Sequence, residues 1–169
     1  MNTIKIIQEL EQNNNVFKAM LLNCSEEEYL WKPSQNKWSL LEIVCHLVDE
    51  EIEDFRARVH SVLENPESTL PPFDPVSRVI ERKYLEKDYN AKVETLLNER
   101  KKSIQGLQQL KDPKWDNSYQ HPKLGAMSAK LFLSNWLAHD YLHMRQILNL
   151  KFEYLKYHSG EDLKYAGDW

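Results

Sequence analysis

Two histidines stand four residues apart in the segment "NWLAHDYLHMRQ", which spans residues 135–146. The segment has a helical pattern, and positions four apart in an α-helix differ by about 40° around the axis. His139 and His143 are therefore expected on one face, one turn apart. Two imidazoles placed in this way can share a metal ion, as the paired histidines of helical zinc sites do.

The face that carries this pair is expected to point into the protein. Its neighbours are apolar: Phe132, Trp136, Ile147 and Leu150. Buried imidazoles need partners, because polar groups without hydrogen bonds are costly to bury, and a metal would satisfy one nitrogen of each ring. Incidental histidine pairs at this spacing are nevertheless common, and a stable site needs at least a third ligand from elsewhere in the chain.

The other four histidines give no third ligand by pattern alone. His46 falls outside the apolar arc of its helix, among Glu42, Asp49 and Glu53, which indicates a groove or surface position. The remaining three are expected to face solvent: His60, His121 and His158.

Length and composition indicate one helical domain over residues 1–169. Of the 169 residues, 41% are hydrophobic, 28% are charged and only 4 are glycine, which favours helix over sheet. The formal net charge is -4 and no basic stripe occurs, so neither nucleic acid nor an anionic membrane is an expected partner.

The chain is expected to be soluble and cytoplasmic. Its N-terminal "MNTIKIIQELEQNNN" lacks the apolar core of a signal peptide, and no apolar run reaches the length of a membrane span. Cys24 and Cys45 form no CxxC pair and are expected to be small buried side chains.

Apolar periodicity predicts four long helices, at about residues 3–22, 39–63, 76–110 and 128–150. The third helix is expected either to be continuous or to break near Asp88, and residues 111–126 are expected to form a loop. Ser39 with Glu42 forms a capping box for the second helix, and Ser128 caps the fourth. The aromatic tail from residue 151 onward is expected to dock on the helices.

Four such helices predict an all-α, antiparallel four-helix bundle. The long connections also permit orders other than simple up-down-up-down. Bundles with aromatic faces often dimerise, so a homodimer is among the expected partners.

Two motifs together resemble the DinB-like (YfiT-like) superfamily of metal-binding four-helix proteins. In "NKWSLLEIVCHLVDEE", a Trp-Ser helix start is followed by a histidine seven residues after the serine: Trp38, Ser39 and His46. The later "SNWLAHDYLHMRQI" carries the histidine pair, and the ending "LKYAGDW" resembles the tail of such proteins. The motifs occur in the family's order, and the resemblance covers nearly the whole chain.

The resemblance implies up-down-down-up connectivity and a divalent metal ion, zinc or nickel, held by His46, His139 and His143. Three neutral imidazoles leave a coordination position for water or substrate, as in catalytic sites. The implied activity is that of a metal-dependent enzyme for a small-molecule substrate, either a hydrolase or an S-transferase for a low-molecular-weight thiol. The alternative is a non-enzymatic, stress-related binding protein of the same fold.

Two carboxylates are candidates for a catalytic role beside the metal. Asp140 follows His139 and lies about 100° around the helix from it, so it is the first candidate for orienting a ligand or transferring a proton. Asp49 flanks His46 and is the second candidate, whereas Glu42 is expected to be a solvated charge. Four aromatic residues are candidates for a substrate pocket, although helical aromatics more often belong to the core: Trp38, Trp136, Tyr141 and Trp169.

Overall fold

The structure is a computed structural model that describes residues 1–167. Residues 168 and 169 lie outside the described part of the chain, and with them the pocket candidate Trp169 and the end of the "LKYAGDW" motif. Within residues 1–167, no helix is both long and apolar enough to span a membrane.

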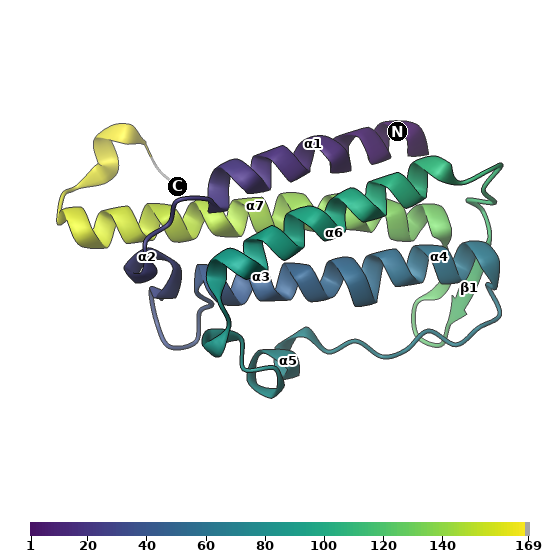
Figure 1. The fold of residues 1–169 in the computed structure, drawn as a ribbon, viewed down its shortest axis with the longest axis horizontal. Helices are drawn as coiled ribbons and strands as arrows, with labels where there is room; N and C mark the ends of the chain where they lie inside the picture. The colour runs from purple at the N-terminus through teal and green to yellow at the C-terminus, as the bar shows by residue number, and fades with distance from the viewer. Residues whose placement is uncertain (168–169) are drawn as a thin grey trace.

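Four long helical rods form the body of the protein (Figure 1), which confirms the predicted four-helix bundle. They are α1 (Thr3–Leu21), the continuous rod of α3 (Leu40–Asp49), a π-helical segment (Glu50–Phe55) and α4 (Arg56–Glu64), then α6 (Tyr89–Gln109) and α7 (Ala129–Ser159). Both α1 and the α3–α4 rod pack against α6 and α7, so they occupy opposite corners. In Figure 1, α1 and α7 run from right to left, and the other two rods run from left to right.

Side-chain caps fix where the rods begin. The Ser39 hydroxyl accepts a hydrogen bond from the Glu42 amide, and the Glu42 carboxylate accepts one from the Ser39 amide at 2.8 Å, which completes the predicted capping box. Asp88 caps α6 through the Ala91 amide, and Ser128 caps α7. A shorter cap at Ser25 starts α2 (Glu26–Leu30).

The third predicted helix, at residues 76–110, is broken near Asp88, which is the alternative that the sequence left open: α5 (Pro75–Glu81) and a 3-10 turn (Tyr84–Glu86) precede α6, which Asp88 caps. The other connections differ from the sequence-based expectation in two places. The predicted loop contains a hairpin of β1 (Ser118–His121) and β2 (Gly125–Ser128). Helix α7 continues past Leu150 to Ser159, and the following residues 160–167, with a 3-10 turn at Leu163–Ala166, are mostly exposed rather than docked.

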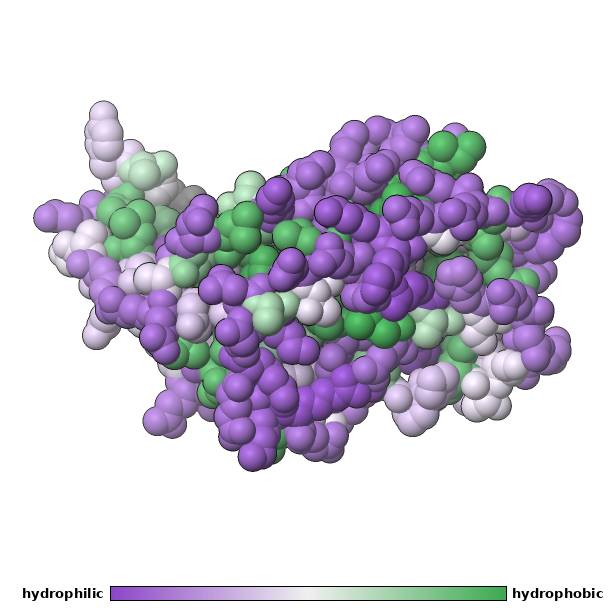
Figure 2. Space-filling model, viewed as in Figure 1, coloured by the Kyte–Doolittle hydropathy of each residue, from purple (hydrophilic) through white to green (hydrophobic). Residues whose placement is uncertain are grey.

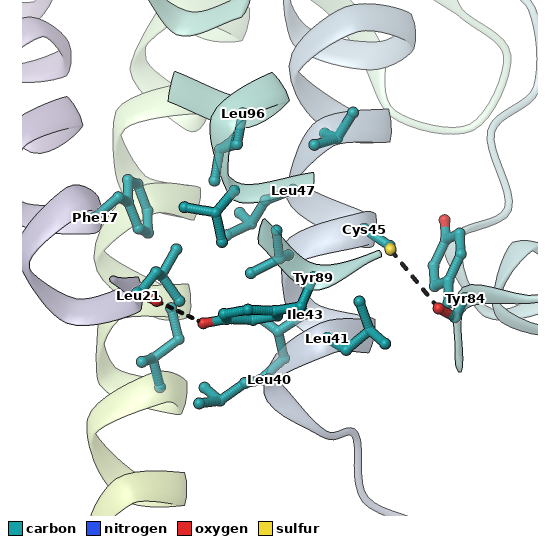
Figure 3. Packing of buried hydrophobic residues seen from close by; sticks show 14 of the residues in the cluster. Phe17, Leu21, Leu40, Leu41, Ile43, Cys45, Leu47, Tyr84, Tyr89 and Leu96 are labelled. Atoms are coloured by element: carbon teal, nitrogen blue, oxygen red, sulfur yellow. Dashed lines mark hydrogen bonds between the residues drawn. The ribbon is translucent and has the colours of Figure 1, made fainter. Parts of the chain in front are cut away.

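Buried apolar side chains from all four rods fill the interior. Figure 3 shows the part of this core in which Phe17 and Leu21 of α1 face α3 and α6. There the Tyr89 hydroxyl donates a hydrogen bond to the Leu21 carbonyl at 2.8 Å and so ties α6 to α1. Cys45 is buried in this core, Cys24 is half-buried, and both are free thiols. Hydrophilic residues cover most of the outer face seen in Figure 2.

Helix α3 is buried on every side. All of its residues from Leu40 to Asp49 are buried, including the polar Glu42, His46 and Asp49. A helix that is covered on all faces has no polar side, so the position of His46 outside the apolar arc does not place it at the surface. The expectation of a surface position for His46 was therefore wrong. Its side chain points into the space between α3 and α7, where it lines a cavity, so the groove alternative describes it better.

Candidate metal centre

Three imidazoles from two rods meet between α3 and α7. His46 comes from α3, and His139 and His143 come from consecutive turns of α7. The Nε2 atom of His143 lies 3.1 Å from Nε2 of His46 and 3.1 Å from Nε2 of His139. The three ligand atoms all lie within 4.8 Å of one another. The structure thus brings together the three residues that the family resemblance implied as ligands.

This arrangement fits a divalent metal ion. Metal–nitrogen bonds of about 2.0–2.1 Å, at angles between 90° and tetrahedral, place two ligating nitrogens about 2.8–3.4 Å apart. The two separations of 3.1 Å lie inside that range. Without an ion, three converging ring nitrogens cannot all form hydrogen bonds with one another, because each such bond needs one nitrogen that carries a proton and one that does not. A metal ion would bind all three.

The surroundings keep the imidazoles in the neutral form that binds metals. Burial, together with the neighbouring His143, lowers the pKa of His46 to about 3. Burial and the same neighbour lower the pKa of His139 to about 2, and burial also lowers the pKa of His143. Protons therefore compete little with a metal for these nitrogens near neutral pH.

Glu50 is a site residue that the sequence interpretation missed. It follows His46 by four positions, and its Oε1 lies 3.7 Å from Nε2 of His46. Burial, and then the charge of Asp54, raises the pKa of Glu50 to about 8. A dication beside it would act in the opposite direction, because positive charge favours the carboxylate. The four-residue spacing was the available signal, but Glu50 stands in the acidic run "DEEIED", which resembles a solvated face.

The π-helical segment Glu50–Phe55 begins at this glutamate. Such wide turns are rare and often mark functional sites in helices. Its first residue, Glu50, faces the histidines, while the next, Glu51, is 1% exposed and bonded inside the core. Its last residue, Phe55, places its ring 5.0 Å from the ring of His139. One short segment therefore supplies groups on two sides of the cluster.

Asp140 is buried beside the cluster but is bonded to the opposite side of α7. Its two oxygens accept hydrogen bonds from Arg100 at 2.7 and 2.8 Å, and one also accepts from Asn13 at 3.0 Å. Arg100 also binds Glu51 at 2.8 Å. Asp140 thus links α7 to α6 and α1, and its predicted catalytic role stays a prediction.

Asp49 likewise has its own partners. It accepts a hydrogen bond from the Tyr84 hydroxyl at 2.5 Å and pairs with Arg82 at 2.9 Å. These contacts attach the segment before α6 to α3, and a catalytic role for Asp49 also remains a prediction. Glu42 is not the expected solvated charge, because it is 2% exposed and bound to Lys32 at 2.8 Å.

The aromatic candidates take different positions. The Trp38 ring lies 5.0 Å from the His46 ring, at the opening of the cluster. Trp136 is buried in the core, where it donates a hydrogen bond to Glu51 at 3.1 Å. Tyr141 is 47% exposed, on a different side of α7.

Two cavities adjoin the histidine cluster: His139 lines both, whereas His46 and His143 line only the first. The first, of about 360 Å³, is open to solvent and has polar residues at its rim: Asn36, Lys37, Trp38 and Gln146. The second, of about 420 Å³, extends toward the hairpin, where His121 is half-buried rather than solvent-facing. Both cavities include Glu50, Pro75 and His139 in their walls.

Fold and site together define a four-helix bundle with a three-histidine candidate metal centre. The family model of the DinB superfamily matches residues 9–147, and the chain belongs to that superfamily. Among curated proteins, none matches the chain. Among solved structures, the chain is similar to YfiT from Bacillus subtilis, described as a probable metal-dependent hydrolase with an unusual four-helix bundle topology. The likeness covers 95% of this chain and 89% of that one, with a TM-score of 0.78 and 17% identity, and it shows the shared fold.

Proposed function

We propose that this protein is a metal-dependent hydrolase of a small-molecule substrate. The observation that carries the proposal is the convergence of three Nε2 atoms, with two separations of 3.1 Å, on one point between α3 and α7. The description of the structurally similar YfiT as a probable metal-dependent hydrolase supports the same activity. Imidazole ligands suit both zinc and nickel, so the proposed metal is one of these two.

In this proposal, His46, His139 and His143 bind the ion through Nε2 and leave part of its coordination shell to water or substrate. The bound ion supplies a Lewis acid and lowers the pKa of water at that position. Glu50 lies next to His46 and is placed to take a proton at Oε1 and return it to a leaving group. Trp38 stands at the solvent-open mouth of the site, with its ring 5.0 Å from that of His46.

A thiol S-transferase is the second candidate, and the pair of cavities favours it. Hydrolysis needs one organic substrate and water, whereas thiol transfer needs two organic reactants at one centre. The rim of the open cavity, with Lys37, Asn36 and Gln146, suits the polar groups of a low-molecular-weight thiol. The second cavity would then hold the electrophile.

A third candidate is a non-enzymatic, stress-related binding protein. It would require the metal's coordination shell to be closed by a fourth protein ligand, and Glu50 is the nearest carboxylate to His46 that offers one. We also propose a cytoplasmic location, which the two free cysteines support because free thiols suit a reducing compartment.

The first experiment is elemental analysis of protein purified without a histidine tag, for the native chain and for the His139→Ala, His143→Ala double variant. About one metal ion per native chain, lost in the double variant, is the expected result. His158→Ala is the matched control, because His158 is exposed and lies outside the cluster. Native protein that stays metal-free after reconstitution would overturn the proposal. A panel of esters, amides and lactones, with and without added thiols, then separates hydrolysis from thiol transfer.

A further inference from the structure

The second cavity differs in character from the metal centre that it adjoins. Its wall is largely apolar and comes from four separate parts of the chain. Phe55 belongs to the π-helical segment, Phe73 to the connection before α5, Met127 to β2, and Phe132 to α7. A volume of about 420 Å³ lies within the range of small-molecule sites, which are mostly apolar with a few polar groups at one end.

The rim of this cavity exposes large apolar side chains. Leu124, at the tip of the hairpin, is 69% exposed, and Leu142 of α7 is 54% exposed. Both would lose contact with water if an apolar group entered between them, which favours such an occupant.

Three charged side chains line this cavity: Glu50, Asp54 and Arg58. Glu50 belongs to its histidine end, whereas Asp54 and Arg58 form an ion pair, and Arg58 donates a hydrogen bond to the Pro71 carbonyl at 3.2 Å. A charged group in the apolar part of the cavity would compete with this ion pair, whereas a neutral one would leave it in place.

We propose that this cavity binds the uncharged aryl or alkyl part of the substrate, while the polar, reacting end of the same molecule reaches the three histidines. This inference rests on the proposed function, because it takes the histidine cluster as the reaction centre. Glu50 and His139 stand in the walls of both cavities, so a molecule held in the second cavity can present its polar end to His139. The substrate class is therefore a neutral, apolar small molecule with a hydrolysable group at one end.

Hydroxamic acids test this inference by binding rather than by turnover, because their polar head coordinates a metal and their tail is freely chosen. Calorimetry on metal-loaded protein compares acetohydroxamic acid, benzohydroxamic acid and 4-carboxybenzohydroxamic acid. We expect benzohydroxamic acid to bind about 10-fold or more tighter than acetohydroxamic acid, since each buried methylene-sized group contributes about 4-fold. 4-Carboxybenzohydroxamic acid should lose that gain in affinity. Equal affinity for the acetyl and benzoyl compounds, or full retention of the gain by the carboxylate, would overturn the inference.

Ala138→Phe provides the matching variant. Ala138 is exposed on α7, next to His139, and lines the cavity, so a larger side chain there fills the space without entering the core. The benzoyl preference should disappear in Ala138→Phe and persist in Ala91→Phe, a change at an exposed position of α6 outside the cavity. An unchanged preference in Ala138→Phe contradicts the inference.

Failure of the metal centre and failure of the cavity give different results. If neither acetohydroxamic nor benzohydroxamic acid binds, the metal centre has failed, and the cavity is then tested alone with toluene. Broadening of the toluene proton signals by the native protein, but not by Ala138→Phe, would support the cavity as an apolar site. Equal broadening by both proteins, or none, would overturn it.

Discussion

Glu50 Oε1 lies 3.7 Å from Nε2 of His46, one turn further along the same rod, where the α-helix gives way to a π-helical segment. The carboxylate therefore stands beside the metal-binding face of an imidazole rather than in solvent. Its position makes Glu50 the best-placed proton acceptor of the candidate centre.

We expect Glu50→Gln to lower kcat by about 10²-fold or more, as removal of a general acid or base does. Metal content should stay near that of the native protein, because the three imidazoles are untouched. Paired activity assays and elemental analysis check this result, with Glu94→Gln, at an exposed position of α6, as the control. A loss of metal together with activity would instead make Glu50 a ligand, as the non-enzymatic alternative requires.

Acid should lower the stability of the metal-free protein at pH values at which most carboxylates are still ionised. An unfolded histidine has a pKa near 6.5, whereas burial holds that of folded His46 at about 3. The unfolded chain thus binds more protons below pH 6.5, and stability present above that pH is lost as the pH falls toward 3. Each unit of pKa difference corresponds to about 1.4 kcal/mol per group.

Chemical denaturation of chelator-treated protein at several pH values measures this slope. Replacing all three cluster histidines with glutamine should flatten it, and His158→Ala should leave it unchanged. A native slope no steeper than that of the triple glutamine variant between pH 6.5 and 4 would contradict burial of neutral imidazoles. When the metal is bound, the loss of stability at low pH should include release of the ion, because protons compete for the same nitrogens.

The two thiols should differ in reactivity. Cys45 is 1% exposed, and burial raises its pKa to about 11, so little thiolate forms at pH 8. Cys24 is half-buried beside Lys151, whose Nζ lies 3.3 Å from its sulfur. Iodoacetamide followed by peptide mass spectrometry should show Cys24 modified first, and Cys45 only after unfolding. Equal labelling in the native state would show that the core around α3 opens readily.

The bundle was predictable from local rules, because caps and periodicity act over a few residues. Ser39 with Glu42 located the start of α3, and the spacing of His139 and His143 placed both on one face of α7. The hairpin was not predicted, since its strands of four residues each lack a clear alternation of apolar and polar positions.

His46 and Glu50 were harder to interpret from the sequence, because their environment is set by distant segments. An interpretation from periodicity assumes that one face of a helix is exposed to solvent, but α3 is buried on all sides. The polar residues of the rod around His46 find partners on other elements, as Asp49 does with Tyr84 and Glu51 with Arg100. Only the family resemblance indicated that His46 is a metal ligand, and the sequence interpretation did not single out Glu50.

Arg100 binds Glu51 and Asp140 in the core and is 3% exposed. Arg100→Met would leave two buried carboxylates without a counter-charge, which should cost about 3–5 kcal/mol of the free energy of unfolding.

Asp140→Asn keeps the shape of the side chain but weakens its pair with Arg100, so a smaller loss of stability is expected. If Asp140 serves mainly to hold α7 against α6, Asp140→Asn should keep its metal and most of its kcat. A large fall in kcat at unchanged stability would instead support the catalytic role predicted for Asp140. Urea unfolding together with kinetics at saturating metal distinguishes the two. Lys5→Met, at an exposed pair with Glu9 on α1, serves as the comparison because surface ion pairs contribute little.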